Sequence, residues 1–168
     1  PEIVETIPNV DHRHGNGDAE VIGIAALDEN GVVVPMLEPS RALIIRISVR
    51  AKQPIERPNV GFMMRNHLGM DFAGTNTDRE DVRLEPMQPG DIATVDFHLR
   101  LPELYPGHFS FSPAVANGDH LHYEMCDWLE NALALEMAHE GKPVYGYLHL
   151  PCQIRVNSRL NAGPAIPE

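Results

Sequence analysis

The chain has 168 residues, the usual size of a single domain, so one buried core is sufficient for it. Its formal net charge is −11, from 24 acidic residues against 13 Lys and Arg, which argues against a nucleic-acid or anionic membrane surface as a partner. No apolar run reaches the roughly 20 residues of a membrane span, so we expect no direct membrane insertion. Two cysteines are too few for a disulfide framework and fit a reduced, cytoplasmic compartment.

The chain opens with a polar stretch that contains a glycine-rich segment, and we interpret residues 1–18 as a linker or mobile lead-in. Because the chain begins at Pro1 rather than Met, we expect it to be a piece of a longer protein. A folded domain is then expected over residues 19–168. Its first strand is predicted at residues 19–27, and an Asn-Gly turn leads from it into the short apolar run 32–34.

The middle of the chain alternates apolar and polar residues with the period of two that half-buried strands show. Strands are predicted on this basis at residues 41–52, 59–66, 70–75, 93–101, 108–115 and 120–125. Gly and Pro fall between these runs, as expected where strands end in turns.

The last third of the chain is less regular. Residues 127–130 (DWLE) are predicted to form a short helix, and residues 132–139 a strand. Residues 146–156 alternate again and predict a final strand. The sequence therefore predicts an all-β antiparallel sandwich, immunoglobulin-like or jelly-roll, with seven to nine strands and one short helix.

The sequence carries no catalytic or nucleotide-binding motif that we can identify. A P-loop, a nucleophile elbow, a dinucleotide fingerprint and paired cysteines at zinc spacing are all missing. Most acidic residues fall in loops or turns, where solvated charge is the simpler interpretation than a glycosidase pair. We therefore expect a domain that is not an enzyme and needs no cofactor.

One histidine-rich run is the best candidate for a metal site. His120 and His122 share a face of the predicted strand, and Glu124 follows. The spacing departs from the cupin motif because only Tyr123 separates His122 from the acid. We expect solvated histidines and no metal here, and we interpret His12 and His14 likewise as solvated linker residues.

The outward faces of the predicted strands offer a mixture of side chains suited to sugars, which bind through flat aromatic surfaces and planar hydrogen-bonding groups. The candidate carbohydrate-binding residues are Arg65, His108, Ser110, Ser112, Tyr147, His149 and Gln153. Any solvated strand face can show such a mixture, so this pattern alone favours no ligand.

Residues 60–77 (VGFMMRNHLGMDFAGTNT) resemble the central hairpin of the Wzt carboxy-terminal domain. The resemblance rests on Gly61-Phe62, on Gly69 at the turn and on the exit run Gly74 to Thr77. Further on, Pro106 to Phe109 followed by Phe111-Ser112 is similar to the Gly-x-Tyr/Phe strand of that family, and Asp127-Trp128 to its acidic-Trp segment. In our interpretation Trp128 plugs the end of the sandwich core.

The resemblance implies an immunoglobulin-like domain that follows the ATPase module of an ABC transporter and recognises finished O-antigen polysaccharide at its modified non-reducing end. It further implies a homodimer that exchanges a terminal strand, for which residues 146–156 are the candidate element. The missing ATPase module would connect it to the transporter membrane subunit, at the cytoplasmic face of the bacterial inner membrane. Two alternatives stay open, a cupin-like metal-dependent sugar-modifying enzyme using His120, His122 and Glu124 or His149, and a dimerisation module without a ligand.

Overall fold

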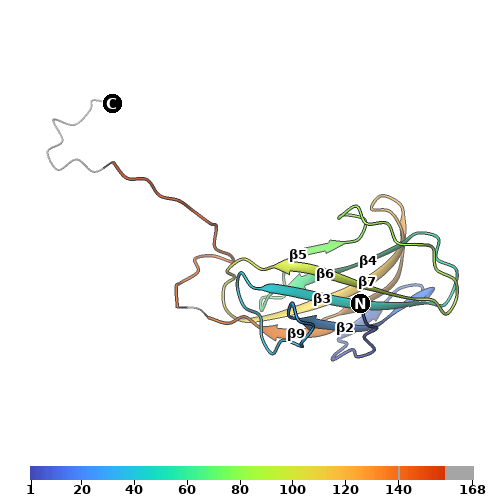
Figure 1. Ribbon diagram of the computed structural model, residues 1–168. Helices are drawn as coiled ribbons and strands as arrows, with labels where there is room; N and C mark the ends of the chain where they lie inside the picture. Colours follow the sequence, from blue (N-terminus) through green and yellow to red (C-terminus); the bar gives the residue numbers. More distant parts are fainter. Residues whose placement is uncertain (140, 158–168) are drawn as a thin grey trace.

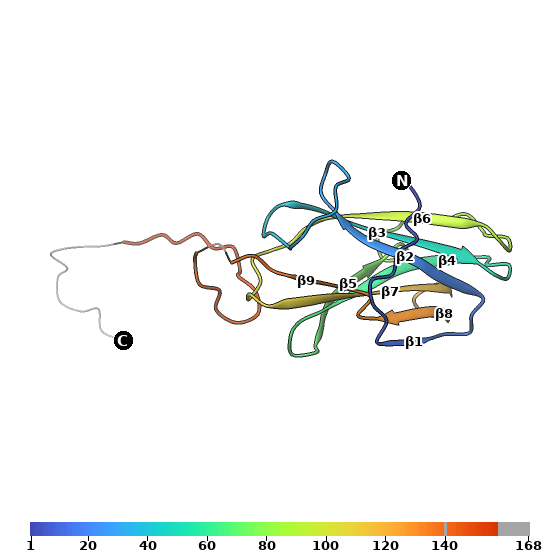
Figure 2. The ribbon, with the colours of Figure 1, turned by 90° about the horizontal axis from the view of Figure 1, so that it is seen from below.

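The computed structural model describes residues 1–139 and 141–157 and shows two antiparallel β-sheets packed in two layers (Figures 1 and 2). The strands are β1 (His12–His14), β2 (Ala19–Leu27), β3 (Ala42–Ala51), β4 (Pro58–Arg65), β5 (Asp71–Asn76), β6 (Ile92–Arg100), β7 (His108–Gly118), β8 (Tyr123–Glu130) and β9 (Leu133–Glu136). The larger sheet has the order β1-β8-β7-β4-β5 with β9 also paired to β7, and the smaller has the order β2-β3-β6. The predicted all-β sandwich is confirmed.

The core lies between the two layers and is built by the alternation that predicted the strands. Ile45 and Ile47 of β3 are fully buried in the smaller sheet. Phe62 of β4 lies with its ring centroid 5.2 Å from that of Phe97 and 5.8 Å from that of Phe111. The Phe62 and Phe97 rings meet edge to face at 81°, which is a favoured aromatic geometry. Strands from both sheets therefore share one apolar interior.

Part of the expected lead-in belongs to the sandwich. Residues 12–14 form β1, which pairs with β8 in the register His14↔Trp128. The Arg13 guanidinium donates to both carboxylate oxygens of Asp127, at 2.9 and 2.7 Å. Asp127 is 5% exposed and also accepts from the Val21 amide. The interpretation of residues 1–18 as a linker missed this strand. β1 is held in place by the ion pair of Arg13 with Asp127, 114 positions away, and such a distant contact leaves no local sequence pattern.

The predicted short helix at residues 127–130 is wrong, because this run is the end of β8. Asp127 and Leu129 point inward and are buried, whereas Trp128 and Glu130 lie on the outer face and are partly exposed. The alternation is hidden in the sequence because the inward position 127 holds a charged residue. Within the described residues there is no helix, and so none that is able to span a membrane.

Strand β7 is central to the larger sheet although it contains a proline. Pro113 lacks an amide hydrogen, which normally excludes proline from a central strand. On the side of β7 away from β4, β9 pairs with residues 108–111 and β8 with residues 114–118. Pro113 therefore falls at the change from one partner strand to the other, where no ladder on that side needs its donor.

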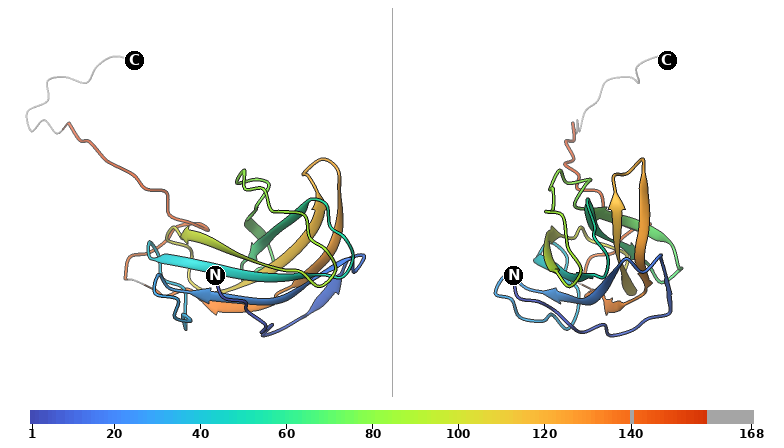
Figure 3. Two further views of the ribbon diagram at one scale, coloured as in Figure 1. Left: turned by 45° about the vertical axis from the view of Figure 1, so that its right-hand side comes forward. Right: turned by 90° about the vertical axis from the view of Figure 1, so that its right-hand side faces the viewer.

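In the part of the chain that the structure describes, the predicted final strand at residues 146–156 is not formed. The segment makes one isolated bridge, Leu104↔Leu148, and then runs away from the sandwich (Figure 3). Leu150, Ile154 and Val156 are 74–81% exposed. The apolar alternation is real, but a strand also needs a neighbour for its backbone groups, and among residues 1–139 and 141–157 no strand lies beside this segment.

Candidate functional site

A groove of about 910 Å³ lies on the outer face of the larger sheet. Its centre is formed by small side chains or none, at Gly61, Gly74, Ala114 and Ala116. Larger apolar side chains, Tyr123, Met125 and Trp128 of β8 together with Met63 of β4, line it as well. Its polar lining residues come from β4 and β5 with the loops beside them, and from the turn between β7 and β8: Arg57, Asn59, Thr75, Asn76, Asp78, Arg79, Asp81, Asp119 and His120.

The depression arises from the register of the sheet. Asn76, Gly61, Ala114 and Trp128 are direct partners on the neighbouring strands β5, β4, β7 and β8. The two middle positions of this row carry no more than a methyl group, while both outer positions carry large side chains. A row of this kind leaves a trough across the strands, with an amide at one end and an indole at the other.

Glycine is required at two positions of the trough by the close approach of β4 and β5. A Cβ on Gly61 would lie 2.5 Å from the Thr75 carbonyl oxygen and from the Asn76 Cβ. A Cβ on Gly74 would lie 2.7 Å from the Phe62 carbonyl oxygen. Real Cβ atoms do not approach a backbone so closely, and any larger residue would push the strands apart as well as fill the groove.

The polar rim is a network of charges that are already paired. The Arg57 guanidinium donates to Asp78 Oδ1 at 2.9 Å and lies 3.6 Å from Asp119 Oδ2. His120 Nδ1 lies 3.3 Å from Asp78 Oδ2. The hydrogen bond with His120, reinforced by Arg57, holds the pKa of Asp78 below its ordinary value. Backbone amides of the β7–β8 turn, first that of His122 and then that of Leu121, lower the pKa of Asp119 in the same way.

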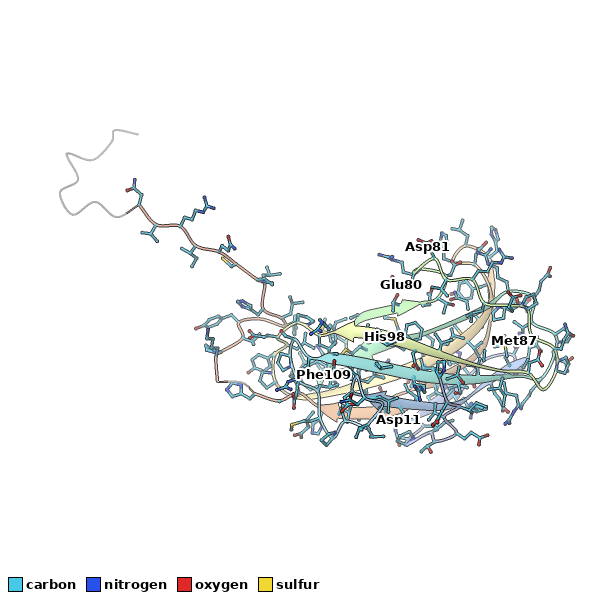
Figure 4. The ribbon with its side chains drawn as sticks, in the orientation of Figure 1. Asp11, Glu80, Asp81, Met87, His98 and Phe109 are labelled. Carbon is cyan, nitrogen blue, oxygen red and sulfur yellow. The ribbon has the colours of Figure 1, made fainter. Side chains whose placement is uncertain are left out.

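More charge lies beside this rim, on the loop that follows β5. Figure 4 labels two of its acids, Glu80 and Asp81. Glu80 accepts a hydrogen bond from the Thr75 hydroxyl at 2.8 Å, and Arg79 Nη1 lies 3.9 Å from Glu80 Oε1. Both signs are present around the groove, so its lining suits a ligand rich in hydroxyl groups better than one that carries a dense charge of either sign.

Trp128 is the residue that the sequence interpretation placed wrongly. It lies on the outer face of β8, partly exposed, and lines the groove rather than plugging the core. Its ring stacks with that of His14 on β1, with centroids 6.1 Å apart and planes 19° apart. A partly exposed indole at the edge of a trough is a flat apolar surface of the kind against which the C–H face of a sugar ring packs.

None of the seven residues predicted as carbohydrate-binding lines this groove. Arg65, Ser110 and Ser112 share the outer face of the larger sheet, and the register pairs Arg65 with Ser110. Arg65 donates from Nε to Asp71 Oδ1 at 2.9 Å. The Ser110 hydroxyl donates to Asn131 Oδ1 at 2.6 Å, and the backbone amide of Asn131 donates to the Ser112 hydroxyl at 3.0 Å. These side chains form hydrogen bonds within the fold.

The other four predicted residues lie farther along the molecule. His108 begins β7 and lies 3.2 Å from Glu136 on β9. Tyr147 and His149 belong to the terminal segment, where their backbone groups bond to residues 103–105. Gln153 follows them and is exposed. The structure therefore does not bring the seven residues together into one site.

The histidines considered for a metal are not gathered into a ligand set. His120 lies beside Asp78, and the 119–122 turn is held by Asp119, whose carboxylate accepts from the amides of Leu121 and His122. Among residues 1–139 and 141–157, no group of three His, Cys, Asp or Glu residues is arranged to hold a metal ion.

Comparison with known proteins identifies a family with the same domain. Residues 10–150 match the family model described as the Wzt C-terminal domain. A solved structure, "Crystal structure of the C-terminal domain of wzt", superposes with a TM-score of 0.80 at 18% identity, covering 93% of this chain and 98% of that one. No curated protein matches. The matched residues 10–150 include β1 and the groove.

Proposed function

This chain belongs to the Wzt C-terminal domain family, the non-catalytic C-terminal domains of ABC transporter ATP-binding subunits, and from this premise we propose that it binds a polysaccharide in the groove of its larger sheet. The observation that carries the proposal is the trough between Asn76 and Trp128, with a small-residue centre and a partly exposed indole. Its paired polar rim supplies donors and acceptors for hydroxyl groups. Binding of this kind needs no proton transfer and no covalent step.

The polysaccharide that we propose is an O-antigen, recognised as a finished chain and delivered to export. The site would hold the glycan close to the transporter and so raise its local concentration there, at the cytoplasmic face of the inner membrane. Coupling to the membrane subunit would run through the ATP-binding module of the parent protein.

A second proposal concerns assembly. Residues 146–156 present an alternating apolar strip whose backbone groups have few partners among the residues that the structure describes. An extended segment with such a pattern is suited to add as a strand to a second copy. We propose a homodimer formed by exchange of this segment, which would carry Tyr147, His149 and Gln153 onto the partner protomer. Arg65, on the same strand as Gly61 and Met63, remains a proposed contact beside the groove.

The groove is tested by titrating the protein with O-polysaccharide from the bacterium that encodes it, followed by calorimetry and by fluorescence of Trp128. Trp128→Ala should lower the affinity about tenfold, since it removes the stacking surface. Ala114→Leu should lower it at least as much, because a larger side chain fills the centre of the trough. Tyr145→Ala is the aromatic control, because Tyr145 is 85% exposed and lies outside the groove.

Saturable binding that both groove variants weaken, with the length of the glycan unchanged, supports recognition at this site. Shortening of the glycan would show an enzyme instead. If a folded dimer binds neither the cognate nor an unrelated O-polysaccharide, the carbohydrate proposal fails, and the dimerisation module becomes the better account.

A further inference from the structure

We propose that His14 and His12 of β1 form an additional sugar subsite beyond Trp128, so that the protein binds a run of several linked sugars laid across its strands. This inference rests on the proposed function and assigns a role to two residues that the sequence suggests only as solvated histidines. In this arrangement the glycan lies along the groove and runs perpendicular to the strands.

The register of the larger sheet supports this orientation. The row Asn76, Gly61, Ala114 and Trp128 continues to His14, which is the direct partner of Trp128 on β1. Five neighbouring strands thus contribute one residue each. With strands roughly 4.8 Å apart, the row spans about 19 Å, which is longer than a single sugar ring and matches a short oligosaccharide.

Two further aromatic rings lie beside Trp128, past the end of the groove. The His14 ring is stacked 6.1 Å from Trp128, and the His12 ring lies 5.9 Å from His14 at 40°. Both histidines are exposed and lie on the same face of β1, since they are two residues apart in a strand. An imidazole offers a flat face together with a ring-nitrogen donor and acceptor, which suits the alternating C–H and hydroxyl surfaces of sugars.

Strand β1 is held firmly enough to serve as a platform. Backbone amides of Asn9 and Asp11 donate to the carbonyls of Ala132 and Glu130, and those of Asn16 and Gly17 donate to Met125 and Cys126. Between them the Arg13 guanidinium is anchored on Asp127. The two histidines therefore project from an edge strand that is fixed at both of its ends, and a ligand does not need to order that strand first.

The test is the dependence of affinity on ligand length. Oligosaccharides of increasing size, released by mild acid from the O-polysaccharide of the encoding bacterium and fractionated by size, are titrated into the full chain. His14→Ala, alone and with His12→Ala, should lower the affinity for the longer oligosaccharides by about 3- to 10-fold. The shortest oligosaccharides that bind should be unaffected. His14→Phe should retain most of the affinity.

His98→Ala is the matched control, because His98 is exposed on β6 in the opposite sheet (Figure 4). Equal affinities of the wild type and the histidine variants at every length would overturn the subsite, as would an equal loss at every length. If Trp128→Ala still weakens binding in those cases, the groove proposal stands by itself. If no oligosaccharide or polysaccharide binds, the proposed function fails together with the subsite.

Discussion

At the scale of single residues, Asp127 shows how a buried charge is accommodated in an apolar layer. Burying a carboxylate is costly unless it is paired and hydrogen-bonded. Here Arg13 binds it through two nitrogens, and the Val21 amide donates a third hydrogen bond. The Arg13 guanidinium also donates to the Val21 carbonyl oxygen at 3.1 Å. The pair therefore joins β1 to β8 and to β2.

Arg13→Met should lower the free energy of unfolding by about 1–3 kcal/mol, because Asp127 keeps only one donor while the 40% exposed arginine is partly screened by water. Arg41→Met is the control, since its ion pair with Glu38 is exposed and should change stability by less than about 0.5 kcal/mol. Urea unfolding followed by fluorescence measures both. Equal stabilities of the two variants would show that the pair contributes nothing.

At the scale of the elements, the corner between β8 and β9 depends on Asn131. Its backbone has φ 56°, in the left-handed region that asparagine tolerates better than most residues. Its side chain accepts a hydrogen bond from the Ser110 hydroxyl and donates one to the Asp11 carboxylate. Its backbone amide donates to the Ser112 hydroxyl. This one residue directs the chain from one partner of β7 to the next.

Ser112→Ala should cost about 1–2 kcal/mol of stability, because the amide of Asn131 loses its acceptor at a position where Ser112 is fully buried. The affinity for polysaccharide should stay unchanged. Thermal unfolding and calorimetric titration of the same variant decide between a structural role and the ligand contact that the sequence suggests. A loss of affinity without a loss of stability would restore Ser112 as a binding residue.

The strands of the core were predictable because their alternation is local. β2 begins and ends at the predicted residues, and β3, β4, β5 and β6 do so within one or two. β1 and the end of β8 were not predictable, because each depends on the Arg13–Asp127 pair across the sheet. The groove was not predictable either. Small residues at 61, 74, 114 and 116 form a trough only when the register sets them side by side, and that register is not a property of any one segment.

At the scale of the whole molecule, the lowered pKa values of three aspartates make stability depend on acid pH. Asp78, Asp119 and Asp11 all have pKa values lowered in the folded protein by hydrogen bonds from neighbouring groups. Such groups bind protons more weakly when folded than when unfolded, so protonation favours the unfolded chain. Their stabilisation is present above the ordinary value of 3.8 and is lost as the pH falls through the lower folded values.

The urea midpoint should therefore fall steadily as the pH is lowered below about 4. Above about pH 4 these three aspartates should leave the midpoint nearly constant. Asp119→Asn should show a shallower fall, because the amide oxygen still accepts from the turn amides but does not titrate. Glu29→Gln, at an exposed turn position, should follow the wild type. Parallel curves for all three proteins would rule out Asp119 as a source of the acid sensitivity.

The row across the larger sheet draws one residue from each of five strands, at positions 14, 61, 76, 114 and 128. Each position belongs to a separate strand that is fixed by its own inward-facing residues. A point substitution at 14, 76 or 128 thus alters one contact and leaves the others in place. Under the proposed function, such a layout would let the glycan specificity change one sugar at a time while the scaffold stays constant.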